Sequence, residues 1–174
     1  MLSIPKRVLL ALVAVLAAVS VLLAWVVKDP ARQEVRAAFF GYLGDLRQGL
    51  NPSASRRILP ADLGLLKQGA LDRAGSDPVF RGEAMEFLGI GDAAGFTAVP
   101  KERFFEFLLD RTMKMHPRVR DVLSEGKVVG TGVKRTGSDA DLTASFVLQV
   151  PEGPRHFTMR IRLTKVDDAW FLRL

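Results

Sequence analysis

The side chains best suited to acid–base or metal chemistry are few in this sequence, and they are widely spaced. The chain has no cysteine, which excludes disulfides, thiolate catalysis and cysteine zinc sites. Its two histidines, His116 and His156, have no acid or nucleophile at a motif spacing, and two are too few for a histidine metal cluster. The pairs Asp139-Asp141 and Asp167-Asp168 fall in predicted turns, where aspartate is favoured for local hydrogen bonding. We therefore expect no catalytic site, no bound metal and no cofactor.

Two arginines, Arg160 and Arg162, have the clearest potential for binding. Apolar and polar residues alternate over positions 157–164, which predicts a strand with both guanidinium groups on its polar face. Arg173 and Lys134 are expected to share that face. A solvated sheet surface is the simplest interpretation, and a patch for an acidic partner or lipid headgroups is the alternative. Nucleic acid is not expected, because no aromatic residues are interleaved with the arginines.

The phenylalanine-rich stretch 104–109 is a second candidate surface. Most of its apolar residues follow one helical stripe, but Phe107 lies off that stripe and is expected to be exposed. Core packing accounts for most of the stretch, and a groove for a partner or a lipid is the alternative. Phe107 therefore joins the arginines as a candidate partner-binding residue.

The elements that would position these residues follow from hydrophobic periodicity. Apolar spacing with proline and glycine boundaries predicts helices near residues 30–49, 60–74, 79–88 and 100–115. From Gly126 the period changes to two, which predicts about four antiparallel strands with one apolar face. Loops are expected at residues 51–55 and 89–100, and the glycines of the latter lack the features of a phosphate-binding loop. Helices followed by strands predict an α+β domain.

The amino-terminal run that begins at Val8 and ends at Val27 contains no charge. Its length suits a hydrocarbon core of about 30 Å, so it predicts a transmembrane helix in contact with the lipid bilayer. A cleaved signal peptide ending near Ser20 is the alternative. Lys6 and Arg7 precede the run, which favours a cytoplasmic amino terminus and an exported domain.

The predicted organisation is therefore a basic tail at residues 1–7, a transmembrane helix at residues 8–27 and one α+β domain at residues 28–174. The predicted location is the inner membrane of a bacterium, as a single-pass protein whose soluble domain faces the periplasm. Its expected partners are the bilayer and a protein of the cell envelope, and it could form an oligomer.

The order of elements resembles that of the nuclear-transport-factor-two-like superfamily, also called SnoaL-like or cystatin-like. The resemblance rests on the amphipathic segment 35–43, on the last three strands and on the ending 163–172, in which an acidic turn precedes a strand containing Trp170. Segment 80–88 is similar to a helix opening seen in many SnoaL-like members. The helix at 100–115 departs from the family, because many members begin strands there. The resemblance implies amino-terminal helices packed on a bent, cone-like antiparallel sheet.

A cone-like sheet would give this chain a pocket, and the residues expected to line it are Tyr42, Phe39, Phe146 and Trp170. In steroid-isomerase-like members a tyrosine in the cone polarises a carbonyl together with carboxylic acids. The apolar faces of the two best strands carry no such acid here, so a core tyrosine is the simpler interpretation of Tyr42. The predicted function is thus a non-enzymatic binding or assembly module of an envelope complex. The alternative is a binder of small apolar ligands, or an isomerase-like or hydrolase-like enzyme, that uses the cone as its pocket.

Overall fold

The computed structural model describes residues 29–174 of the chain. The chain divides into two compact units, residues 1–34 and residues 35–174. In the first unit, the Asp29 carboxylate accepts hydrogen bonds from the backbone N–H of Ala31 (3.1 Å) and of Arg32 (3.4 Å). Asp29 therefore caps the helix that begins at Pro30, as the sequence predicted.

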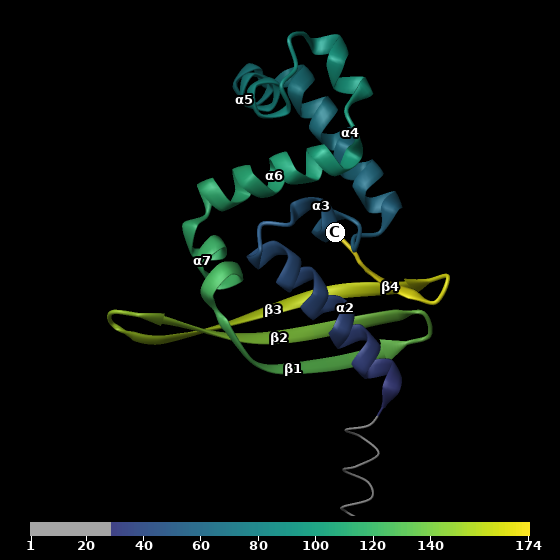
Figure 1. Cartoon of the computed structure of the whole chain (residues 1–174), viewed down its shortest axis with the longest axis vertical. Coiled ribbons are helices and arrows are strands. Elements are labelled where there is room, and N and C mark those ends of the chain that lie inside the picture. The colour runs from purple at the N-terminus through teal and green to yellow at the C-terminus, as the bar shows by residue number, and fades with distance from the viewer. Residues whose placement is uncertain (1–28) are drawn as a thin grey trace, which may run out of the picture. The chain divides into compact units, whose positions relative to one another are not determined.

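The described chain is α+β, with helices first and four antiparallel strands after them (Figure 1). The helical elements are α2 (Pro30–Arg47), α3 (Asn51–Ser55), α4 (Pro60–Ser76), α5 (Pro78–Leu88), the 3-10 helix η1 (Ala93–Ala98), α6 (Lys101–Met115) and α7 (Pro117–Glu125). The strands are β1 (Lys127–Thr136), β2 (Asp139–Val150), β3 (Gly153–Val166) and β4 (Ala169–Leu172).

Three short helical elements were not predicted from the sequence. α3 and η1 lie where loops were expected, and α7 follows α6 after a single residue, His116. Pro117 ends one helix and begins the next, because its fixed φ suits a first helical position while it restricts the residue before it.

The sheet is a meander in which each strand pairs with the next one along the chain. Two-residue turns connect the paired strands, and the one between β3 and β4 consists of Asp167 and Asp168. Both aspartates have positive φ, 47° and 65°, as the central residues of a two-residue hairpin with right-handed twist require. Aspartate tolerates this conformation better than most residues other than glycine and asparagine.

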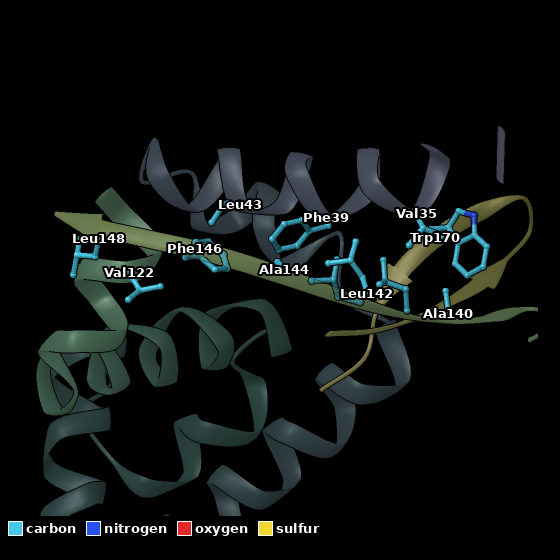
Figure 2. Packing of buried hydrophobic residues seen from close by; sticks show 12 residues of the cluster. Val35, Phe39, Leu43, Val122, Ala140, Leu142, Ala144, Phe146, Leu148 and Trp170 are labelled. Atoms are coloured by element: carbon cyan, nitrogen blue, oxygen red, sulfur yellow. The ribbon is translucent and has the colours of Figure 1, made fainter. Parts of the chain in front are cut away.

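One face of the sheet is covered by α2, and the main core lies between them. Strand β2 buries every second residue, and these side chains form one core cluster with residues of α2 and with Val122 of α7 (Figure 2). From α2, three residues one helical turn apart meet them: Val35, Phe39 and Leu43. The rings of Phe39 and Phe146 pack edge to face with centroids 6.5 Å apart. The predicted alternation of β2 is thus confirmed, and hydrophobic burial fixes which face of the sheet turns inward.

A second core holds α4, α5 and α6 together. Its centre is Phe107, which is 2% exposed and contacts the rings of Phe80 (centroids 5.2 Å apart) and Phe87 (5.6 Å). The prediction that Phe107 lies exposed is therefore wrong. The helix α6 has apolar neighbours on more than one side, so a single stripe does not describe its buried surface: Phe105 packs in a third core with Ile58.

The segment between α3 and α4 joins these helices to the sheet. Ile58 forms a parallel bridge with Leu172 of β4; the Leu59 N–H donates to the Leu172 carbonyl (2.9 Å), and the Leu172 N–H donates to the Arg57 carbonyl (2.8 Å). The Arg57 guanidinium also pairs with Asp45 of α2 at 2.5 Å. Residues 57–59 therefore join the edge of the sheet through backbone hydrogen bonds and α2 through the side chain of Arg57.

Arg47, the last residue of α2, caps the end of α7. Its Nε donates to the Leu123 carbonyl (2.8 Å), and its Nη2 donates to the Gly126 carbonyl. The last carbonyls of a helix lack partners within the helix, so a basic side chain placed there is stabilising.

No helix within residues 29–174 is both long and apolar enough to cross a membrane. This finding corrects the predicted fold, which included a transmembrane helix, together with the membrane assignment that rested on it. The expected span at residues 8–27 and the expected tail at residues 1–7 lie outside the described residues.

Candidate functional site

The outer face of the sheet, opposite the core, brings charged residues of three strands into one row. Asp141 of β2 lies in register with Lys134 of β1 on one side and with Arg162 of β3 on the other. In the neighbouring row of that face, Thr143 lies opposite Arg160. Both arginines are exposed, as are Lys134 and Asp141. The prediction that Arg160 and Arg162 stand on the polar face of their strand is confirmed.

A groove of about 400 Å³ lies over these residues, and we call it the sheet groove. The residues that line it are Lys134, Thr136, Asp139, Ala140, Asp141, Arg160, Arg162, Leu163, Arg173 and Leu174. Its charged lining comprises four cations and two carboxylates. Neither Arg160 nor Arg162 forms an ion pair within residues 29–174, so both guanidinium groups are available to a partner.

Arg173 is placed differently from the other two arginines. Its backbone N–H donates to the Arg162 carbonyl (2.8 Å), which continues the pairing of β4 with β3. Its side chain, however, turns to α4, where Nε lies 2.9 Å from Oδ2 of Asp62. Arg173 was predicted as a partner-binding residue, but its guanidinium is already engaged with a carboxylate that is 6% exposed.

The electrostatics of Asp62 follow from this contact. Burial alone would raise the pKa of the Asp62 carboxyl. Hydrogen bonds from Arg173 and from the Leu174 N–H (2.9 Å), together with the charge of Arg173, outweigh burial and hold that pKa below its usual value. The contact raises the pKa of Arg173 in turn, so both groups stay charged over the physiological range.

Asp139 and Asp141 were predicted to lie in a turn, yet they begin strand β2. They are exposed and line the sheet groove beside the arginines. The sequence did not place Asp141 on a strand, and only the register of the sheet shows that it lies between Lys134 and Arg162. Asp141 therefore belongs to the candidate site and places a negative charge between two cations.

The four residues expected to line a cone pocket do not enclose one. Phe39, Phe146 and Trp170 are 2%, 0% and 8% exposed, and all three belong to the core between α2 and the sheet (Figure 2). Their side chains pack in that core, and Phe146 also borders a hollow of about 180 Å³ between α7 and β3. These three side chains therefore belong to the packed core and do not together line one open cone.

Tyr42 lies at the edge of this core and borders a different hollow, of about 350 Å³. Burial raises the pKa of the Tyr42 hydroxyl to about 12, so the group stays protonated at neutral pH. The charged residues that line the hollow are Arg160, Arg162 and Arg173, and none of its lining residues is acidic. The carboxylic acid that a carbonyl-polarising tyrosine would need is therefore missing from its surroundings.

The two histidines lie in different parts of the described chain. His116 lies between α6 and α7, His156 lies in β3, and both are exposed. Within residues 29–174, no cluster of three or more histidine, cysteine, aspartate or glutamate side chains could hold a metal ion. The sheet groove gathers the exposed charged residues of three strands, and it is the candidate functional site considered below.

Comparison of the chain with protein-family models and with curated proteins finds no match in either set.

Proposed function

We propose that this protein is a non-enzymatic binding module that holds an acidic segment of a partner protein in the sheet groove. The observation that supports the proposal is the pair Arg160 and Arg162, exposed side by side on one strand face without an ion pair in the described chain. A guanidinium group presents a planar fork of donors that fits a carboxylate with two parallel hydrogen bonds.

The rigidity of the backbone below the groove favours this function. Arg160 and Arg162 lie on β3. Residues 153–164 of β3 pair with the whole length of β2. Their spacing is therefore set by the strand, and a partner does not have to order a loop when it binds. Exposed charges of this kind contribute little to folding, so the arginines are free to be used for recognition.

A charge-reversal variant tests the proposal. Full-length Arg160→Glu/Arg162→Glu should lose a partner protein that copurifies with the wild type, and its thermal stability should be nearly unchanged. The matched control is Arg56→Glu/Lys127→Glu, which makes the same change in net charge at two exposed residues outside the groove. If the groove variant copurifies with the same proteins as the wild type and the control, the groove does not bind a partner.

A second variant should act in the opposite direction. Asp141 lies in register with both Lys134 and Arg162, so its carboxylate repels an acidic ligand at the centre of the row. Asp141→Asn should tighten binding of the partner by about threefold to tenfold, as expected when a like charge is removed from a partly screened surface. Unchanged or weaker binding would show that the row does not contact the acidic residues of the partner.

A further inference from the structure

The first half of β3 is an unpaired sheet edge. β4 pairs with β3 only from Leu163 to Val166, and the Arg173 N–H adds one bond to the Arg162 carbonyl. On the same side, no described backbone group pairs with the residues of β3 that precede Arg162. The edge can be followed in Figure 1, where β3 runs well beyond the end of β4.

The pattern of hydrogen bonds shows which backbone groups this edge presents. In an antiparallel ladder, alternate residues direct both their N–H and their C=O to the same neighbouring strand. The carbonyl of Arg162 accepts from the β4 side, so the backbone groups of Arg160 and Thr158 face that side as well. Those of Phe157 and Met159 face β2, with which they are in register. Thr158 and Arg160 therefore offer the donors and acceptors that one added strand needs.

Two hollows flank this edge and meet at Met159. The first, of about 180 Å³, lies between α7 and β3 and is lined by Arg118, Val119, Val122, Phe146, Phe157, Thr158 and Met159. The second is the hollow beside Tyr42, which Met159, Ile161 and Leu172 also line. The apolar side chains of Phe157, Met159 and Ile161 are half-buried there. Both hollows thus lie where side chains of an added strand would enter the inner face.

The charges around the edge indicate the chemistry of its occupant. The charged residues lining the two hollows are all arginines, namely Arg118, Arg160, Arg162 and Arg173, and only the last of these is engaged in an ion pair within the described chain. Along β3 itself, apolar residues face inward while Arg160 and Arg162 face outward. A strand beside β3 would repeat that alternation, because side chains of neighbouring strands meet on the same face.

We propose that the partner binds by adding an extended segment to β3 beside Thr158 and Arg160, with apolar residues entering the two hollows and acidic residues on the outer face alternating with them. This inference rests on the proposed binding function and specifies how the acidic segment is held. Backbone hydrogen bonds supply affinity for any extended chain, and the hollows and arginines select its side chains.

A synthetic peptide of about eight residues, the length of a typical strand, is the probe. In this peptide valine alternates with glutamate. The peptide is titrated into the full-length protein. A second peptide replaces glutamate with lysine, and a third keeps the first composition but groups the valines and the glutamates in two blocks. The alternating valine–glutamate peptide should bind at least about tenfold more tightly than either control, because only it satisfies both faces of the edge. Equal binding of the block peptide would overturn the inference.

Backbone amide exchange, measured by nuclear magnetic resonance, tests without a mutation whether the N–H groups of the β3 edge are unpaired. In the free protein the amides of Thr158 and Arg160 should exchange quickly, whereas those of Phe157 and Met159 should be protected by β2. Adding the alternating peptide should slow exchange at Thr158 and Arg160 by about tenfold or more. If the peptide binds but these two amides stay fast, strand addition is wrong.

Two variants separate this inference from the proposed function. Thr158→Pro removes an edge N–H that has no partner in the described chain, so it should weaken peptide binding about tenfold while thermal unfolding stays close to wild type.

If Thr158→Pro binds normally while Arg160→Glu/Arg162→Glu does not, the groove binds acidic partners by another geometry and only the inference fails. If the arginine variant also binds normally, the proposed function fails. Dimerisation of the free protein that Thr158→Pro abolishes would assign the edge to a second copy and overturn the inference.

Discussion

Oδ2 of Asp62 accepts two hydrogen bonds at 2.9 Å, one from Nε of Arg173 and one from the backbone N–H of Leu174. Asp62 lies in the first turn of α4, and it is 111 residues from Arg173 in sequence. A buried carboxylate thus fixes the segment that follows β4 to the helices. Arg173 thus contributes to the stability of the fold, whereas the proposed binding uses Arg160 and Arg162 of the same groove.

Removing the charge of Asp62 should destabilise the fold. Asp62→Asn leaves a buried side chain that can no longer form the charged contact with Arg173, and we expect a loss of about 1–3 kcal/mol in the free energy of unfolding. Chemical unfolding followed by circular dichroism measures the change. Asp72→Asn, at an exposed position of the same helix, is the control and should stay within about 0.5 kcal/mol of wild type.

The same carboxylate should make stability depend on pH in the acid range. The folded pKa of Asp62 lies below its usual value, so its contribution is complete above an unfolded pKa of about 3.9. That contribution is lost as the pH falls through the folded pKa. The difference in unfolding free energy between wild type and Asp62→Asn should therefore be constant from about pH 5 to pH 7 and shrink below about pH 4. A constant difference throughout the acid range would contradict the role of this carboxylate.

Two glycines of α2 should respond in opposite ways to alanine. A Cβ added at Gly44 has no heavy atom of another group within 4 Å, so Gly44→Ala should stabilise the protein by about 0.5–1 kcal/mol through helix propensity. A Cβ added at Gly41 would lie 2.5 Å from Nη1 of Arg57 and displace its pair with Asp45. Gly41→Ala should therefore be less stable than Gly44→Ala, as thermal unfolding of the two variants would show. Equal stability would mean that Arg57 moves aside without loss.

The turn between β3 and β4 should accept a stabilising change. Asp168 has a φ of 65°, a conformation that glycine adopts without steric cost. Asp168→Gly removes the steric cost of a positive φ and loses only the exposed 3.6 Å contact of Asp168 with Lys165, so it should raise the unfolding free energy by about 0.5 kcal/mol. Asp168→Val serves as the opposite control, because a β-branched residue is strained at positive φ. A higher melting temperature for valine than for glycine would contradict the turn geometry.

Local patterns in the sequence predicted what local physics decides. Alternation with a period of two placed Phe146 on the inner face and Arg160 and Arg162 on the outer face, because successive side chains of a strand point to opposite faces of the sheet. The prediction for Phe107 was wrong because a single helical stripe assumes a single neighbour, whereas α6 packs into two cores. Trp170 was predicted to line a cone pocket, and the structure instead packs its side chain in the core.

Contacts between distant parts of the chain were beyond such patterns. Nothing near Arg173 indicates that its guanidinium will meet Asp62, since the contact depends on how α4 packs beside β4. The place of Asp141 between two cations depends in the same way on strand register. The membrane-spanning helix was predicted from the length and the uncharged, apolar composition of residues 8–27, and no helix of the described chain has that character.

The open edge of β3 also bears on solubility. An unpaired strand with apolar neighbours is a template on which identical chains can stack, and natural proteins commonly place charged side chains there to prevent it. If two copies met along this edge, Arg160 and Arg162 of one would approach the same arginines of the other, and like charges on neighbouring strands repel. The arginines would therefore act as gatekeepers against aggregation while the edge stays accessible to a segment of opposite charge.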